Sequence, residues 1–96
     1  MDPSGKLIGA GDFRAQTQQC FENLATAVEA AGGSFRNIVK LSVYVLDISK
    51  LPDYRDVRDR YVDANSPPAS TALQVAALFR TEFMIEIEAV AALPQA

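Results

Sequence analysis

The sequence predicts one small α+β domain, in which two helices cover one face of a single β-sheet. Apolar residues recur every three or four positions over 13–31 and again over 51–64, as in amphipathic helices. Apolar and polar residues alternate over 37–46 and over 83–91, as in half-buried strands. The 96 residues are enough for one domain, and neither an internal repeat nor a low-complexity segment divides them. We therefore expect a single domain over residues 1–96.

The first helix is expected to begin after Asp12, whose side chain is of the type that caps helix N-termini. Gly32 and Gly33 are expected to end the helix, because glycine adopts the left-handed C-terminal conformation at little cost. The predicted apolar stripe consists of Phe13, Thr17, Phe21, Leu24, Val28 and Ala31. Cys20 lies beside this stripe and is expected to be an inert packing residue, since a nucleophilic cysteine needs a basic partner.

The segment from Asn37 to Leu46 predicts the first strand. Its expected core face carries Val39, Leu41, Val43 and Val45, and its other face carries Lys40, Ser42 and Tyr44. A second helix is predicted from Leu51 to Ala64, capped by Asp47 or Ser49. Its apolar stripe is Leu51, Tyr54, Val57 and Tyr61, and the mixed charges of residues 53–60 predict a solvated outer face.

The segment Asn65–Pro68 breaks the second helix, because proline lacks a backbone donor and restricts the residue before it. A strand is predicted from Ser70 to Leu78 and another from Phe83 to Ala91, joined by a turn at Arg80–Thr81. Two consecutive strands with a short link predict a β-hairpin.

Composition excludes several functional classes. The net charge is −3 and no cluster of lysine and arginine stands out, so nucleic-acid binding is not expected. No apolar run approaches the length of about 20 residues that spans a membrane. The single cysteine is a poor start for a metal site and fits a reducing, cytoplasmic location. Because there is no histidine, acid–base chemistry near neutral pH must come from carboxylates, tyrosine, the backbone or bound water.

Glu86 and Glu88 are the best candidates for chemistry. They are two positions apart in a predicted strand, so both point to the same side, about 6.6 Å apart along the strand. Two such carboxylates can position a water molecule or hold a cation. The alternative interpretation is that they mark the solvated face of a half-buried strand.

Six segments, in the right order and with the right gaps, make the chain similar to the RidA/YjgF family, also called L-PSP endoribonuclease-like. Residues 2–7 (DPSGKL) resemble the family's D-P-x-[ST]-G-x-L loop, and residues 16–33 resemble its first helix. Residues 40–47 resemble the V-K-x-T-V-Y-L-x-D strand. Residues 68–71 (PAST) and 74–78 (QVAAL) resemble P-A-R-[ST] and V-A-x-L, and residues 85–91 (IEIEAVA) resemble the closing strand.

This resemblance implies a chorismate-mutase-like fold and a homotrimer with ligand clefts between its subunits. It implies hydrolysis of enamines or imines with release of ammonia, and no metal or organic cofactor. In the family, the first glutamate of the E-I-E segment helps to position the attacking water, and this glutamate is Glu86 here. The arginine of P-A-R pairs with the substrate carboxylate. We assign Ser70, Arg80 and Glu88 to substrate binding alongside the catalytic Glu86.

The chain departs from the family in two respects. Ser70 stands where the family has its arginine, and a hydroxyl lacks the two charge-assisted hydrogen bonds of a guanidinium. The chain also begins where the family has already formed two N-terminal strands. Two alternatives follow: the sequence starts late, or the protein is a shortened variant. For a shortened variant we expect a sheet without these two strands, whose bare edge is covered by a partner or by residues 1–11.

Three functions remain open. The first is a homotrimer that binds a small carboxylate or imine ligand at its subunit interfaces but is degenerate for catalysis. The second is an active imine deaminase with Glu86 activating water. The third, which rests only on the family's older name, is endoribonuclease activity or translation inhibition; the negative charge and the absence of histidine argue against it.

Overall fold

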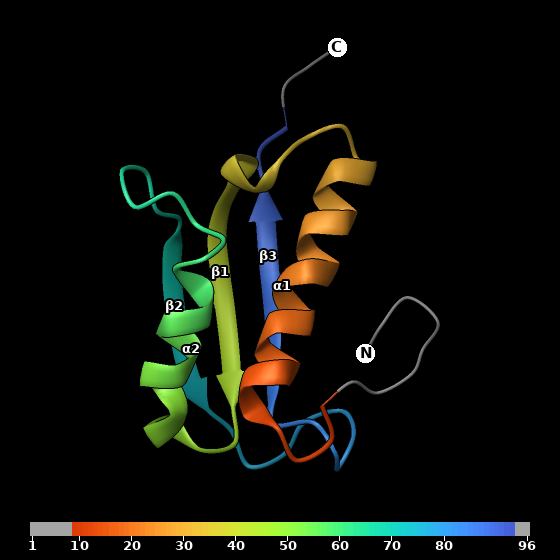
Figure 1. Cartoon of the computed structure of the whole chain (residues 1–96), viewed down its shortest axis with the longest axis vertical. Helices are drawn as coiled ribbons and strands as arrows, with labels where there is room; N and C mark the ends of the chain where they lie inside the picture. The colour runs from red at the N-terminus through yellow and green to blue at the C-terminus, as the bar shows by residue number, and fades with distance from the viewer. Residues whose placement is uncertain (1–8, 94–96) are drawn as a thin grey trace.

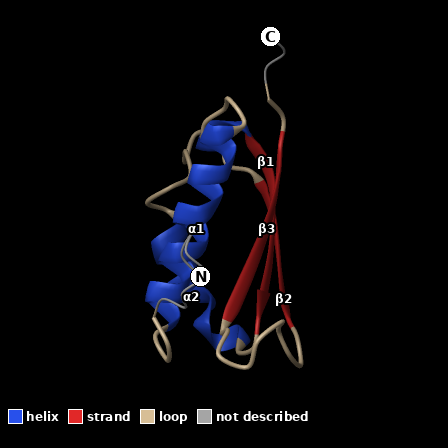
Figure 2. Ribbon diagram, turned by 90° about the vertical axis from the view of Figure 1, so that its right-hand side faces the viewer, coloured by secondary structure: helices blue, strands red, loops and turns tan. Residues whose placement is uncertain are grey.

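A computed structural model describes residues 9–93 and shows two helices packed on one sheet (Figure 1). Helix α1 (Phe13–Ala30) precedes strand β1 (Ile38–Val45), and helix α2 (Leu51–Arg58) links it to strand β2 (Ala69–Gln74). Strand β3 (Ile85–Ala91) closes the described chain, and short 3₁₀ turns η1 (Phe35–Asn37) and η2 (Ile48–Lys50) flank β1. Both helices lie on the same side of the sheet (Figure 2). The α+β class and the two-layer arrangement are confirmed.

The order of strands in the sheet is β2-β1-β3, with β1 parallel to β2 and antiparallel to β3. The hairpin expected from residues 70–91 is therefore wrong, because β1 lies between the two strands. The physical reason lies in α2, which is a crossover connection and returns the chain to the sheet parallel to β1. Residues 75–84 then pass beyond the end of β1 to reach its other side.

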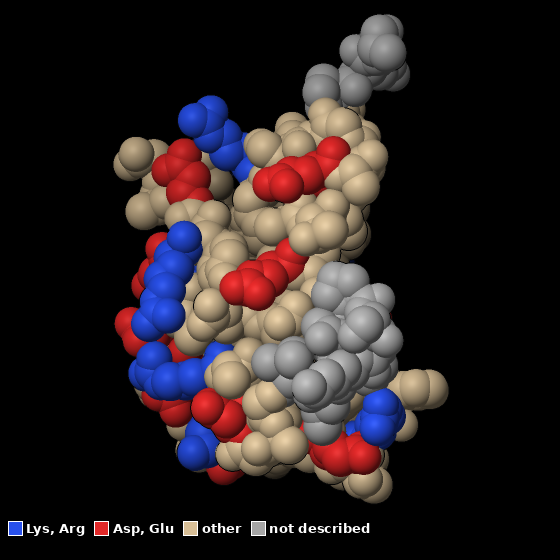
Figure 3. Space-filling view, turned by 45° about the vertical axis from the view of Figure 1, so that its right-hand side comes forward, with Lys and Arg blue, Asp and Glu red and all other residues tan. Residues whose placement is uncertain are grey.

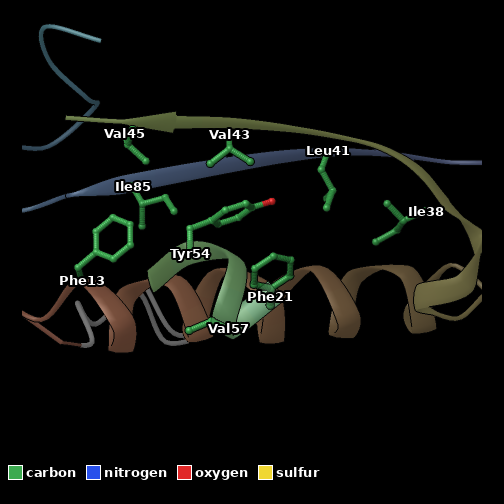
Figure 4. Close-up of a cluster of buried hydrophobic side chains, with 9 residues drawn as sticks. All are labelled: Phe13, Phe21, Ile38, Leu41, Val43, Val45, Tyr54, Val57 and Ile85. Carbon is green, nitrogen blue, oxygen red and sulfur yellow. The ribbon is translucent and has the colours of Figure 1, made fainter. Parts of the chain in front are cut away.

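The core lies between the sheet and the two helices (Figure 4). Leu41, Val43 and Val45 of β1 are almost fully buried, and Phe21 of α1 and Val57 of α2 pack against the same cluster. Phe21 also stacks on Tyr61, with ring centroids 5.1 Å apart and an interplanar angle of 13°. Aromatic contacts of this kind join α1 to the segment that follows α2.

The predicted cap of α1 is confirmed, with Asp12 accepting a 3.0 Å hydrogen bond from the Ala15 N–H. The cap predicted for the second helix is wrong, because the N-cap position of α2 is Lys50, which makes no side-chain cap hydrogen bond, and a 3₁₀ turn precedes it. Asp47 caps the η2 turn by accepting from Ser49. At the other end of α1, Gly32 adopts a positive φ of 91°, as expected of a glycine that ends a helix.

One face and several boundaries differ from the prediction. Val39 is not part of the core face: it sits at a β-bulge between Ile38 and Lys40 and is 49% exposed, while Ile38 takes the buried position. Helix α2 ends at Arg58 instead of Ala64, and the chain continues in tighter turns that place Tyr61 on Phe21. Strand β2 ends at Gln74, since its partner β1 ends at Val45.

The face of the sheet that is turned away from the helices has no covering layer among residues 9–93 (Figure 2). Leu73 and Val90 on this face are 52% and 57% exposed. Within the same residues, neither helix is long and apolar enough to cross a membrane.

Candidate ligand-binding site

Glu86 and Glu88 lie on the uncovered face of the sheet, as the alternation of β3 predicted. Across the ladder, Glu86 is opposite Tyr44 and Glu88 is opposite Ser42. Both glutamates line a shallow hollow of about 250 Å³, which we call the sheet-face hollow. Its other walls are Tyr44 and the chain after β2, from Val75 to Phe79.

The Glu86 carboxylate is held in place by the loop between β2 and β3. Its Oε1 accepts a 2.9 Å hydrogen bond from the backbone N–H of Phe79. This contact restricts the rotamers of a half-buried side chain, and a carboxylate retains further lone pairs that can accept a proton or a hydrogen bond from water. Glu86 is thus placed to orient a water molecule over the open sheet.

The two glutamates also border a hollow of about 270 Å³ between α1 and the outer edge of β3. Gln19, Cys20 and Asn23 of α1 form its opposite wall. Cys20 is half-buried there, and burial raises the pKa of its thiol, so the sulfur stays protonated near neutral pH. These features agree with the expectation of an unreactive cysteine.

Ser70 lies on the opposite face of the sheet from Glu86. In the parallel pairing of β1 with β2, Ser70 is aligned with Leu41, whose side chain is buried beneath the helices. Ser70 therefore faces the helix layer and lines a hollow of about 510 Å³, which we call the α2–β2 hollow. The other lining residues are Leu41, Arg58, Asp59, Val62, Ala64, Pro67 and Pro68.

Arg58 is a candidate ligand-binding residue that the sequence does not single out, because the mixed charges of residues 53–60 predict a solvated face. Acidic and basic side chains do interleave on the α2 side of the molecule (Figure 3). The Arg58 side chain, however, is only 28% exposed, lies 5.8 Å from the centroid of the Tyr54 ring and lines the α2–β2 hollow. Its position four residues after Tyr54, on the same face of α2, was the available signal.

Arg80, which we expected to bind substrate, is engaged in the loop between β2 and β3. It forms a 3.3 Å ion pair with Glu82, and its guanidinium lies 5.8 Å from the centroid of the Phe83 ring. Its role in substrate binding stays a prediction. Among residues 9–93 there is no group of three or more acidic or cysteine side chains that would hold a metal ion.

The proposed site residues therefore fall into two groups on opposite faces of one sheet. Glu86 and Glu88 line the sheet-face hollow, and Ser70 lines the α2–β2 hollow. A site that contains both Ser70 and Glu86 needs two copies of the chain.

A model of the family described as Endoribonuclease L-PSP matches residues 1–93. The chain belongs to this family, which is also called RidA/YjgF. A RutC family protein of Pyrococcus horikoshii is 36% identical to this RidA-family chain over 91 residues, which cover 95% of the chain and 71% of the relative. The human 2-iminobutanoate/2-iminopropanoate deaminase is 37% identical over 95% of the chain and 65% of the enzyme.

The fold is also that of the family. The crystal structure of RidA from an Antarctic Psychrobacter species is similar with a TM-score of 0.80 and 37% identity, over 84% of this chain and 64% of that structure. The RidA-family chain thus spans about two thirds of the length of these relatives.

Proposed function

We propose that this chain is a RidA-family ligand-binding subunit that forms a homotrimer, binds a small carboxylate or imine between subunits, and has lost most of the family's imine-deaminase activity. The observation that supports the loss is Ser70, a neutral hydroxyl at the position of the family arginine. Hydrogen bonds to a charged group contribute about 1.5–3 kcal/mol each, so the loss of an arginine weakens carboxylate binding tenfold or more. The single cysteine, which cannot form a disulfide within the chain, is in keeping with a cytoplasmic location.

Assembly is supported by the uncovered face of the sheet. This face carries exposed apolar side chains, among them Leu73 and Val90, next to the sheet-face hollow. A cyclic trimer buries such a face without open-ended growth. It also supplies the second copy that a site with both Glu86 and Ser70 requires.

The second candidate is an active imine deaminase, and the placement of Glu86 favours it. In that reaction, water adds to the imine carbon, the carbon–nitrogen bond breaks, and a carbonyl compound and ammonia are released. Glu86 is fixed by Phe79 and is able to accept the proton of the attacking water. The human relative bears the name of such an enzyme.

An imine-hydrolysis assay distinguishes the two candidates. An amino-acid oxidase generates 2-iminobutanoate, and semicarbazide traps the imine that has not been hydrolysed. We expect little turnover by the wild type and a gain in Ser70→Arg. Robust wild-type turnover that is lost in Glu86→Gln but kept in the surface control Glu29→Gln would overturn the loss of activity and establish the enzyme. Equal and negligible turnover in the wild type and Ser70→Arg would show that Ser70 is not the reason for the low activity.

A further inference from the structure

The α2–β2 hollow combines one guanidinium with apolar walls. Arg58, one turn after Tyr54 in α2, lines one side of the hollow, and Ser70 of β2 also lines it. Leu41, Val62 and Pro67 provide an apolar surround. A pocket of this size with few polar groups is typical of small-molecule sites.

The Arg58 guanidinium is oriented by its neighbours and retains donors for a ligand. It lies against the Tyr54 ring, and its Nε and Nη2 donate to Asp59 Oδ1 at 3.1 and 2.9 Å. The two N–H groups of Nη1 take no part in this ion pair. Asp59 has a 64% exposed side chain, so the carboxylate that competes for Arg58 is itself well solvated.

A buried hydroxyl lies behind the polar wall of the hollow. Tyr54 is 2% exposed, and its hydroxyl makes no hydrogen bond with any described residue. Burial raises its pKa, and the nearby Ser70 side chain and the Arg58 charge partly offset this rise, although no hydrogen bond of good geometry forms. A buried hydroxyl without a partner is rare, because its desolvation is not compensated. The hydroxyl itself does not line the hollow, so the polar groups that a ligand there would meet are those of Arg58, Asp59 and Ser70.

We propose that the α2–β2 hollow is a monocarboxylate subsite in which Arg58 binds the carboxylate and the Ser70 hydroxyl adds a hydrogen bond. The inference rests on the proposed function, since it names the group that replaces the charge missing at Ser70. A guanidinium suits a carboxylate because its planar N–H groups match the two oxygens. The apolar walls accommodate a short aliphatic chain, and Asp59 disfavours ligands with a second negative charge.

The test is a titration of the full chain with 2-oxobutanoate, monitored by isothermal titration calorimetry and by changes in amide chemical shifts. We expect Arg58→Gln to weaken binding tenfold or more and Arg55→Gln, an exposed arginine on the same helix, to leave it unchanged. Asp59→Asn removes the competing carboxylate, and we expect it to tighten binding several-fold. The melting curve of each variant shows whether it folds.

A second pair of variants keeps the test independent of the packing of Arg58. Ser70 and Thr71 are adjacent and exposed in β2 but face opposite sides of the sheet. Ser70→Asp places a negative charge in the α2–β2 hollow, and we expect it to weaken binding tenfold or more, whereas Thr71→Asp does not.

The outcomes separate this inference from the proposed function. Wild-type binding that survives both Arg58→Gln and Ser70→Asp but is lost in Glu86→Gln would overturn the subsite and leave the binding function intact. No binding of 2-oxobutanoate by the wild type at millimolar concentration would overturn both.

Discussion

The Gln16 side chain of α1 accepts a 2.8 Å hydrogen bond from the backbone N–H of Met84, 68 residues further along the chain. The same amide donates to the backbone carbonyls of Glu82 and Gly9, each at 3.1 Å. Gln16 is 5% exposed, so a polar side chain on the buried side of α1 fixes the chain where it enters β3. Glu86 follows two residues after Met84, and its position depends on this contact.

We predict that Gln16→Leu destabilises the domain by about 1–3 kcal/mol, because it leaves the Met84 N–H and the Glu82 carbonyl without their partner. Urea unfolding followed by circular dichroism measures the change. Gln18→Leu is the matched control, since Gln18 is exposed on the same helix and bonds only within it, to Glu22. Equal stability of the two variants would contradict the role of Gln16.

Removal of the Tyr54 hydroxyl is expected to cost little. Because this buried oxygen has no hydrogen-bond partner among residues 9–93, Tyr54→Phe should leave the free energy of unfolding within about 1 kcal/mol of the wild type, or raise it. Tyr54→Ala removes a ring from the core and should destabilise by about 3–5 kcal/mol. A large loss in Tyr54→Phe would indicate that the hydroxyl is bonded in solution.

The ion pairs between α1 and α2 should be lost at acidic pH. Arg14 contacts Asp53 at 2.9 Å and Asp56 at 2.5 Å, and its hydrogen bond lowers the pKa of Asp56. Because the pKa of Asp56 is lower in the folded state, the ion pair stabilises the fold fully above the pKa of an unfolded aspartate, which is about 3.9. This stabilisation is lost as the pH falls through the lower pKa of the folded state.

Arg14→Gln should therefore have a lower melting temperature than the wild type at pH 7, and the difference should vanish as the pH falls through the lowered pKa of Asp56. The difference in melting temperature is expected to be small and to decrease in high salt, since these charged groups are exposed. Arg36→Gln, at an exposed position outside this network, is the control. A difference that persists in acid would show that Arg14 acts through packing.

Cys20 should react slowly with thiol reagents in the folded protein. The sulfur is half-buried and its pKa is raised by burial, so the reactive thiolate is scarce at neutral pH. The rate of reaction with a disulfide reagent should increase many-fold in denaturant. Native protein that reacts as fast as denatured protein would contradict this description.

A charge on the uncovered sheet face should disrupt the proposed trimer. Leu73→Glu places a carboxylate on that face and should shift the mass measured by light scattering toward 10.4 kDa, the mass of one chain. Thr26→Glu, an exposed position on α1, should leave the mass unchanged. A wild-type chain that already has the mass of a monomer at micromolar concentration would refute the assembly itself.

Local patterns in the sequence were enough to place both helices, the three strands and the Asp12 cap of α1. Periodicity identified α1 and β1, because burial on one side of a helix or strand imposes its own repeat on the apolar residues. It also placed Glu86 and Glu88 on a common face, which β3 confirms. The order and spacing of the motifs were sufficient to indicate the family without the fold.

The neighbours of each strand and the contacts between distant side chains emerge from the packed fold and not from local patterns. The order β2-β1-β3 separates segments that look like a hairpin, since pairing depends on the path of the crossover and not on local pattern. The buried Gln16 is polar, and its burial reflects partners more than 60 residues away, at the start of β3. Arg58 is half-buried because it lines the α2–β2 hollow beside the Tyr54 ring. For the same reason, the opposite orientations of Ser70 and Glu86 became visible only when both strands were placed against β1.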